Sequence, residues 1–213
     1  PPAFAEKFDV MPAESRNPDP KSYFENYWYI ELGGDRKIED TEEIRDKLLK
    51  ITYGLWDFVK NKKKGYENFT LDWVGYLPGK RESRRYVGDV IITQKDLEGN
   101  GNVYPDTVAY GGWPMDDHPP EGFYSKKPAC RQIKTAAPYG IPYRALYSKN
   151  VKNLLFAGRN ISASHVALSS TRVMATCAVM GQAVGTAAWV AVKDGLTPRG
   201  IYENRMHELI QTL

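Results

Sequence analysis

One stretch near the end of the chain constrains the fold more than any other. From Val173 to Val192 there are 20 consecutive uncharged residues, a length that would also suit a membrane-spanning helix. Eight of these residues are Ala or Gly, and four more are Thr, Cys or Gln, so the segment is only weakly apolar. This composition favours a thin, buried helix of a folded domain and predicts no membrane span.

The start and one face of this helix carry further information. Ser169 and Ser170 are both good N-cap residues, so we expect the helix to begin near them and to run from about 171 to 193. Gly181 and Gly185 lie four residues apart on one face. Without side chains, they would allow another backbone or a flat ligand to approach closely.

The first half of the chain predicts a second long helix. Apolar residues recur at helical spacing between 44 and 59, and Asp40 with Glu43 has the pattern of a capping box. The basic run that ends at Lys64, followed by Gly65, is typical of a helix end. We therefore expect a helix over residues 41–64.

Other segments alternate with a period of two, as half-buried strands do. Residues 23–32 and 69–93 show this pattern and contain turn residues at their ends, which predicts antiparallel strands. Shorter strand-like runs lie at 143–147 and 154–157. Together with the two helices, these segments predict an α+β fold with an antiparallel β-sheet.

Composition excludes some classes of function. The 213 residues carry 29 Lys and Arg against 26 Asp and Glu, and a net charge of +3 is too small to indicate a nucleic-acid partner. Two cysteines are too few for a disulfide framework. The first residue is Pro rather than Met, and the last helix ends without a breaker, so we expect a piece of a longer protein.

Residues 153–192 have the order strand, Gly-Arg, loop and helix. The run NLLFAGRN ends a short apolar strand at Gly158, where the backbone can face a ligand. The helix that follows offers free N–H groups and the positive end of its dipole to an electron-rich oxygen or a phosphate. A buried strand–helix unit with packing glycines and no ligand explains the same residues, and the pattern alone leaves both open.

The amino-acid sequence of this region resembles a known family. The run NLLFAGRNISASHVALSSTRVMATCAVMGQAVGTAAWVA is similar to the C-terminal flavin-binding segment of FAD-dependent oxidoreductases. Upstream, RESRRYVGDVIITQKD, PDTVAYGGWPMDDHPP and IPYRALYSKNVKN resemble further blocks of that family in the same order. The resemblance covers most of residues 69–192. Some bacterial members of the family carry xanthan-lyase-like labels.

The chain also departs from the family pattern. Members open with a strand, a GxGxxG turn and a helix that hold the FAD pyrophosphate, and no GxGxxG occurs in these 213 residues. The resemblance therefore implies the C-terminal half of such a protein. Residues 1–135 would be a β-rich substrate-side part and residues 136–213 the C-terminal strand–helix portion of a Rossmann-like FAD-binding part, packed as one compact unit. The missing N-terminal GxGxxG part would be the partner of this chain, and without it we expect weak or no FAD binding.

The resemblance implies a set of cofactor-binding residues around two places. Gly158 and Arg159 would lie along the FAD pyrophosphate and ribityl chain, with Asn160 and Ser162 nearby. The other place is the start of the long helix, whose N-terminus would point at the flavin pyrimidine edge: Arg172, Val173 and Met174. A helix dipole there stabilises the negative charge that reduction places on the N1 and O2 side. An ordinary solvated residue is the alternative for Arg172.

Three further residues are candidates for catalysis. The basic run from Lys80 to Arg85 would lie near the reactive face of the flavin, where Arg84 or Arg85 could orient an anionic or hydroxylated substrate. A solvated turn is the alternative for this run. His118 suits proton transfer at neutral pH, although the sequence favours a loop histidine without a role. Asp116 and Asp117 beside it do not complete a metal site, and we expect none.

The leading hypothesis is thus a part of an FAD-dependent oxidoreductase that passes a hydride from a small organic or carbohydrate-derived substrate to the flavin. A carbohydrate-binding or lyase-associated module without redox activity is the alternative. The 14 Tyr and 5 Trp residues motivate it, because aromatic faces stack on sugars.

Overall fold

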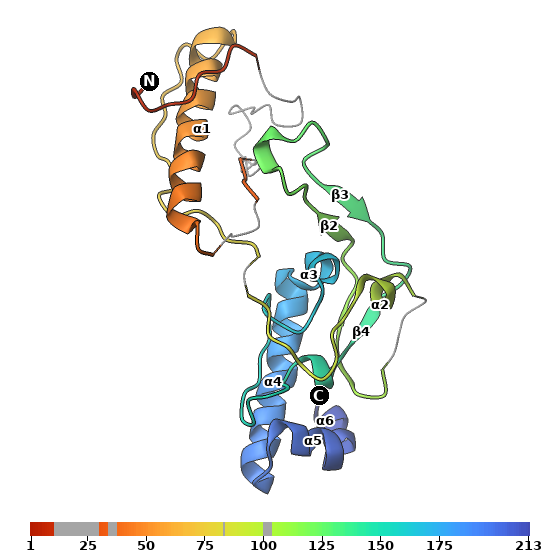
Figure 1. The fold of residues 1–213 in the computed structure, drawn as a ribbon. Coiled ribbons are helices and arrows are strands. Elements are labelled where there is room, and N and C mark those ends of the chain that lie inside the picture. The colour runs from red at the N-terminus through yellow and green to blue at the C-terminus, as the bar shows by residue number, and fades with distance from the viewer. Residues whose placement is uncertain (11–29, 34–37, 83, 100–103) are drawn as a thin grey trace. The chain divides into compact units, whose positions relative to one another are not determined.

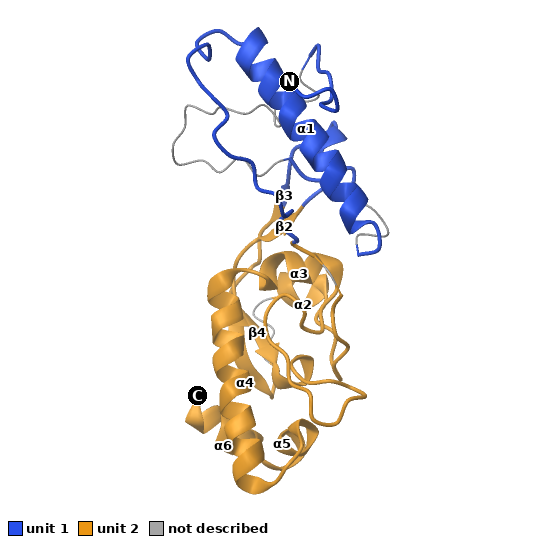
Figure 2. Cartoon of the chain, turned by 90° about the vertical axis from the view of Figure 1, so that its left-hand side faces the viewer, with its two compact units in different colours: residues 1–80, 118–131 blue, residues 81–117, 132–213 orange. Residues whose placement is uncertain are grey.

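A computed structural model describes residues 1–10, 30–33, 38–82, 84–99 and 104–213. The described chain divides into two compact units, coloured separately in Figure 2, rather than the single unit expected from the sequence. Unit 1 comprises residues 1–80 and 118–131, and unit 2 comprises residues 81–117 and 132–213. The predicted functional division at residue 135 follows neither boundary and stays a prediction.

Unit 1 is built around one long helix. Helix α1 spans Thr41–Lys62, which confirms the helix predicted over 41–64. Asp40 is its N-cap residue, but its side chain makes no capping hydrogen bond, so the predicted capping box does not form. Ile51 and Leu55 on the inner face of α1 pack with Phe123 in a small apolar core. Phe123 lies in a single 3-10 turn, η2, which spans Gly122–Tyr124.

Unit 2, orange in Figure 2, holds most of the regular structure. Strand β1 (Thr107–Gly111) pairs antiparallel with β4 (Tyr139–Pro142), and β2 (Met115–Asp117) pairs with β3 (Arg131–Ile133). The other elements in chain order are α2 (Gln94–Glu98), η3 (Tyr143–Ala145), α3 (His165–Thr171), α4 (Met174–Asp194), α5 (Pro198–Asn204) and α6 (Met206–Thr212). This mixture of helices and small sheets agrees with the predicted α+β class.

Helix α4 is the long helix predicted near the C-terminus. The buried residues of α4 recur at helical spacing along one face, which packs against β1, α5 and α6 (Figure 1): Thr176, Met180, Ala183, Ala187 and Val190. The predicted N-cap is wrong, because Ser169 and Ser170 lie inside α3. The N-cap of that short helix is Ser164, whose side chain accepts a hydrogen bond from the Ala167 N–H, and α4 begins only after Val173.

The burial of α4 is one-sided. Met174 is 90% exposed and Val192 is 84% exposed on its outer face. A Cβ added at Gly181 or Gly185 would meet nothing within 4 Å among the described residues, so no close approach is seen there. By length and composition, α4 is the one helix in the described part of the chain that could cross a membrane, and a single helix of this kind is weak evidence for a span.

The strands predicted over 69–93 do not form. Within the described part of that range, the chain is extended or turning, and Ile92 makes a single bridge, parallel to Ala163. Trp73 and Leu77, expected to alternate onto a buried face, are 78% and 79% exposed. Most of the strand predicted at 23–32 lies outside the described residues, and residues 30–32 contain no strand.

The two shorter strand-like runs are also wrong as strands. Residues 143–145 form η3, and Tyr147 and Leu155 face each other in one isolated antiparallel bridge. Two prolines, Pro138 and Pro142, border or end the nearby strand β4, which limits how far a ladder can extend. Paired strands of this unit therefore lie elsewhere, in β1 and β4, whose pairing joins residues distant in sequence.

Candidate functional site

Two segments that the sequence singled out run side by side in unit 2. The Tyr86 N–H donates to the Asn160 carbonyl at 2.9 Å, and the Ile92 N–H donates to the Ser162 carbonyl at 3.0 Å. The Ser164 N–H returns a hydrogen bond to the Ile92 carbonyl at 2.8 Å. The structure thus brings the block that contains Arg84 and Arg85 against the loop that follows Gly158.

Gly158 opens this loop with a backbone that favours glycine. Its φ is +98°, a region that L side chains rarely adopt. A Cβ at Gly158 would meet only Asn160 Oδ1, at 3.9 Å, so the space above the backbone is open. Arg159, the next residue, is exposed. The loop therefore presents backbone and a guanidinium to its surroundings, as a ligand-facing turn would.

Ser162 closes the loop and is buried. Its side chain is 1% exposed, and its Oγ has no hydrogen-bond partner. The residue lines a hollow of about 240 Å³, together with Ala163 and four residues of the adjacent segment: Arg85, Tyr86, Val87 and Ile91. A second hollow, of about 630 Å³, lies at the start of α3 and is lined by Thr93, Gln94, Lys95, Glu98, Ser164, His165 and Val166.

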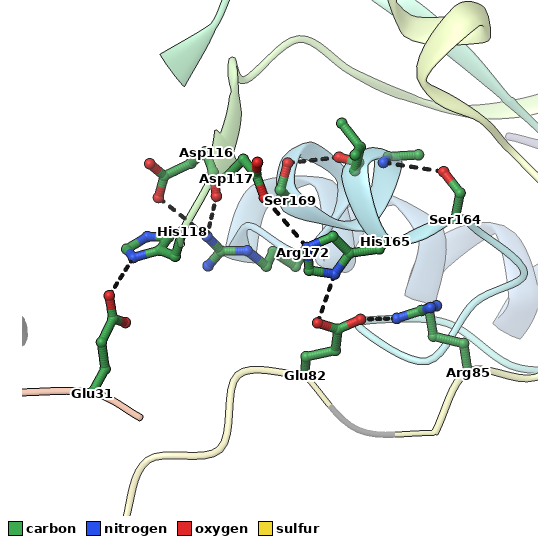
Figure 3. Close-up of polar contacts among 12 residues, drawn as sticks. Glu31, Glu82, Arg85, Asp116, Asp117, His118, Ser164, His165, Ser169 and Arg172 are labelled. Atoms are coloured by element: carbon green, nitrogen blue, oxygen red, sulfur yellow. Dashed lines mark hydrogen bonds and ion pairs between the residues drawn. The ribbon is translucent and has the colours of Figure 1, made fainter. Parts of the chain in front are cut away.

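A chain of charged side chains connects Arg85 to α3 (Figure 3). Arg85 forms an ion pair with Glu82, whose other carboxylate oxygen lies 2.8 Å from His165 Nδ1. The Nε2 atom of the same ring lies 3.3 Å from Asp117 Oδ1. Both ring nitrogens of His165 therefore face carboxylates, one from the segment of Arg85 and one from β2.

Arg172 lies at the other end of α3, as its C-cap residue. Its guanidinium donates to the Asp116 carbonyl at 3.2 Å and to Asp116 Oδ2 at 3.1 Å. Consecutive aspartates of β2 therefore contact the first residue of α3 and the residue that ends it (Figure 3). With its side chain 15% exposed, Arg172 is no ordinary solvated residue, and that alternative is wrong.

Burial and three nearby charged residues shift the pKa of Arg172. Burial lowers the pKa of Arg172, and the charges of Arg81 and Arg159 lower it further, while Asp116 opposes them. Arg159 of the glycine loop is therefore close enough to the α3–α4 junction to act on it. Burial likewise raises the pKa of the Cys177 thiol in the first turn of α4, and Arg159 opposes this shift.

The start of α4 is accessible. Val173 is the N-cap residue, and its apolar side chain makes no capping hydrogen bond to the first turn. Met174, the first helical residue, is 90% exposed. Thr171, just before the junction, is fully buried, and its Oγ1 has no hydrogen-bond partner. The positive end of the α4 dipole is thus available to a ligand.

His118 belongs to unit 1 and has its own partner. Its Nδ1 lies 2.7 Å from Glu31 Oε1, and the two side chains are 14% and 15% exposed. Backbone contacts fix this pair, because the Phe123 N–H donates to the Glu31 carbonyl. The sequence did not indicate Glu31, which lies 87 positions from His118. No group of three or more potential ligands that could hold a metal ion occurs among the residues the structure describes.

Of the predicted site residues, most meet in one region of unit 2. Arg85 and Ser162 line the same hollow. The Asn160 carbonyl accepts a hydrogen bond from the Tyr86 N–H, next to Arg85. Arg159 lies near Arg172. Arg84 is exposed. Sequence reasoning missed Glu82 as the residue that joins Arg85 to His165; its position inside a basic run was the available signal.

A family model supplies independent information on the whole chain. The model for FAD dependent oxidoreductases matches residues 8–213. The chain belongs to this family. The resemblance indicated by the motifs is therefore confirmed at the level of the family, and FAD is the cofactor that the family implies. No curated protein and no solved structure gives a match. The comparisons lend no support to a carbohydrate-binding or lyase-associated module.

Proposed function

We propose that unit 2 forms part of the flavin site of an oxidoreductase that takes a hydride from a small organic or carbohydrate-derived substrate. The observation that carries the proposal is the accessible, uncapped start of α4 beside the loop of Gly158, in a chain of the FAD dependent oxidoreductase family. Bound FAD supplies an acceptor for a hydride, which carries two electrons and a proton. The protein supplies binding, orientation and a suitable electrostatic field.

The residues present fit a flavin in three ways. Gly158 leaves open space above a backbone with a φ of +98°, which allows a close approach to the cofactor. Arg159 adds a positive charge for the pyrophosphate, with Asn160 and Ser162 in the same loop. Met174 and Val173 place N–H groups at the start of α4, where negative charge on a reduced flavin would be stabilised.

The catalytic assignments follow the same proposal. Arg84 and Arg85 of unit 2 would orient the substrate. His118, whose Nδ1 contacts Glu31 within unit 1, stays the candidate for proton transfer. The GxGxxG turn that holds the pyrophosphate would lie outside residues 1–213, in an N-terminal part of the same polypeptide, with residues 136–213 as the C-terminal portion of the FAD-binding part. These 213 residues alone would then bind FAD weakly, whereas the protein expressed from its complete gene would be yellow.

Two glycine variants test the cofactor site in that complete protein. Gly158→Ala should lower the free energy of unfolding by about 1–3 kcal/mol through backbone strain, and should also lower the ratio of flavin to folded protein. Gly195→Ala is the matched control. Gly195 ends α4 with a φ of +64° and open space, away from the loop, so this variant should lose stability and keep its flavin.

The measurements are thermal unfolding and flavin absorbance on the same samples. Equal flavin ratios in folded Gly158→Ala and Gly195→Ala would contradict the assignment of the Gly158 loop. A complete protein that purifies without flavin and takes up none from excess FAD would contradict the proposed function as a whole.

A further inference from the structure

His165 directly follows the loop of Gly158 in unit 2. It is the first residue of α3, and its side chain is 53% exposed and lines the hollow of about 630 Å³ at the start of that helix. The backbone beside it is fixed, because the Ser164 N–H donates to the Ile92 carbonyl and the Ser164 side chain caps α3. An imidazole that is held in place and open to a hollow can act on a molecule bound there.

Two carboxylates hold the His165 ring at unequal distances (Figure 3). Nδ1 lies 2.8 Å from Glu82 Oε2, a normal hydrogen-bond length. Nε2 lies 3.3 Å from Asp117 Oδ1, just beyond the roughly 2.7–3.2 Å that is usual for N–H···O bonds. A neutral imidazole has one N–H and one nitrogen that accepts, so the shorter contact favours the tautomer with its hydrogen on Nδ1. Nε2 is then the acceptor.

The hollow beside this ring is lined mostly by groups that form hydrogen bonds. Six of its seven lining residues are polar or charged, and only Val166 is apolar. Gln94 donates to Glu98 at 2.6 Å, and Lys95 is exposed beside them. Donors and acceptors together match a molecule with several hydroxyls, since each hydroxyl both donates and accepts. The volume of about 630 Å³ falls within the roughly 300–1,000 Å³ of small-molecule sites.

Glu82 connects the ring to a residue that would orient the substrate. One oxygen of its carboxylate contacts His165 and the other pairs with Arg85. Because Glu82 and Asp117 lie on opposite sides of the ring, both would stabilise the positive charge that the ring gains when it accepts a proton. The arrangement is thus suited to a group that takes up a proton during a reaction.

We propose that His165 accepts the hydroxyl proton of a polyol or sugar substrate bound in this hollow. The inference rests on the proposed oxidoreductase function, which supplies the hydride acceptor. The substrate O–H bond breaks, and its proton passes to His165 Nε2. The C–H bond on the same carbon breaks as well, its hydrogen leaves as a hydride with both bonding electrons, and a C=O bond forms. Glu82 orients the ring and is a positioning residue.

The state of the ring can be measured without flavin. In ¹⁵N NMR spectra of the histidine-labelled protein at about pH 8, where an ordinary imidazole is neutral, His165 should carry its hydrogen on Nδ1. His165→Ala identifies its signals. Glu82→Gln weakens the hydrogen bond to Nδ1 and should move part of the population to the Nε2–H tautomer. Glu203→Gln, exposed on α5, is the control and should change nothing. Wild-type His165 with its hydrogen on Nε2 would overturn the proposal.

Flavin reduction in the complete protein tests the catalytic role. D-glucose, D-galactose, D-mannose and myo-inositol are added without oxygen, and the absorbance of the oxidised flavin is followed. At least one compound should reduce the flavin, and His165→Ala should slow that reaction about 100-fold or more at an unchanged flavin ratio. Added imidazole should restore part of the rate, because it can occupy the space that the ring leaves. His207→Ala, exposed on α6, is the control and should keep the wild-type rate.

The outcomes separate this inference from the proposed function. A complete protein that takes up no flavin would contradict the proposed function, and the inference with it. A flavin-loaded protein that none of the four compounds reduces would overturn the inference alone. So would a His165→Ala variant that reacts at the wild-type rate, loses its flavin, or gains nothing from imidazole. A large loss of rate in His118→Ala with none in His165→Ala would assign the proton transfer to His118 instead.

Discussion

Buried polar groups are paired around strands β1 and β4, whereas two buried hydroxyls near the ends of α3 are not. Asp106 is 1% exposed and accepts hydrogen bonds from the backbone and guanidinium of Arg144, the latter at 2.9 Å. The Tyr139 hydroxyl lies 2.6 Å from Ser170 Oγ. In contrast, Ser162 Oγ and Thr171 Oγ1 are buried without a partner.

The contrast between paired and unpaired groups distinguishes residues that stabilise unit 2 from residues that bind a ligand. Native proteins leave few buried polar groups unpaired, because each costs about 1–3 kcal/mol, and those that remain call for an explanation. Ser162 and Thr171 lie in the segments that the family resemblance connects with the flavin. We therefore expect variants around Asp106 to change stability alone, and variants at the unpaired hydroxyls to change ligand binding alone.

The largest effect is expected for Arg144→Met. This change removes the guanidinium and leaves the Asp106 carboxylate, whose side chain is 2% exposed, with little compensation. The free energy of unfolding should fall by about 3 kcal/mol, measured by urea denaturation. The contact of Arg144 with the Tyr202 ring, at 5.1 Å, is lost as well. The flavin content of the folded fraction should not change.

Arg205→Met provides the matched comparison. Arg205 also pairs with an aspartate, Asp194 at 2.6 Å, but on the surface, where solvent screens the attraction. Its denaturation midpoint should barely move. Similar losses in Arg144→Met and Arg205→Met would show that the buried pair of Asp106 does not hold the scaffold.

An intermediate effect is expected for Arg172→Gln, which tests the group that lies between the two regions. Loss of its charged hydrogen bonds to Asp116 should cost about 2 kcal/mol of unfolding free energy. If Arg172 also serves the flavin, the flavin-to-protein ratio and the reduction potential of the folded complete protein should fall. Arg172→Lys keeps the charge and should retain the potential better than Gln. An unchanged reduction potential in Arg172→Gln would mean that Arg172 stabilises the fold and does not act on the flavin.

The sequence predicts those features of the fold that depend on interactions between residues close in sequence, and not those that depend on distant residues. Helices α1 and α4 were predicted within a few residues, because periodic apolar positions and end signals are local. The strands over 69–93 were wrong, because an alternating pattern reports which residues prefer burial but not whether a partner strand exists. Trp73 satisfied the pattern and is 78% exposed.

The same limit applies to the site. A backbone that needs glycine at Gly158 was predictable because a glycine after a short apolar run is a local signal, and its φ of +98° agrees. The role of this loop in cofactor binding stays a prediction. The pairs that organise α3 join distant residues: Arg172 with Asp116, 56 positions apart, and His165 with Glu82, 83 positions apart. No spacing rule connects residues so far apart, and only the fold shows that they meet.

No loss of stability is expected for Thr171→Val, which tests the contrast between the paired and the unpaired buried groups. Valine has nearly the same shape and lacks only the hydroxyl, and Thr171 Oγ1 is buried without a partner. Unfolding free energy should therefore stay the same or rise by about 1 kcal/mol. If the hydroxyl is kept for the cofactor at the start of α4, the flavin-to-protein ratio of the complete protein should fall.

Ser170→Ala is the control from the same turn of α3. The Ser170 hydroxyl contacts the Tyr139 hydroxyl and the Trp113 carbonyl, so its removal should cost about 1–2 kcal/mol and leave flavin binding unchanged. The two neighbours should thus show opposite patterns in thermal unfolding and flavin absorbance. Equal losses of stability would mean that a bound water satisfies Thr171 Oγ1. In that case the unpaired hydroxyl reflects hydration, and the distinction between scaffold and site at this junction fails.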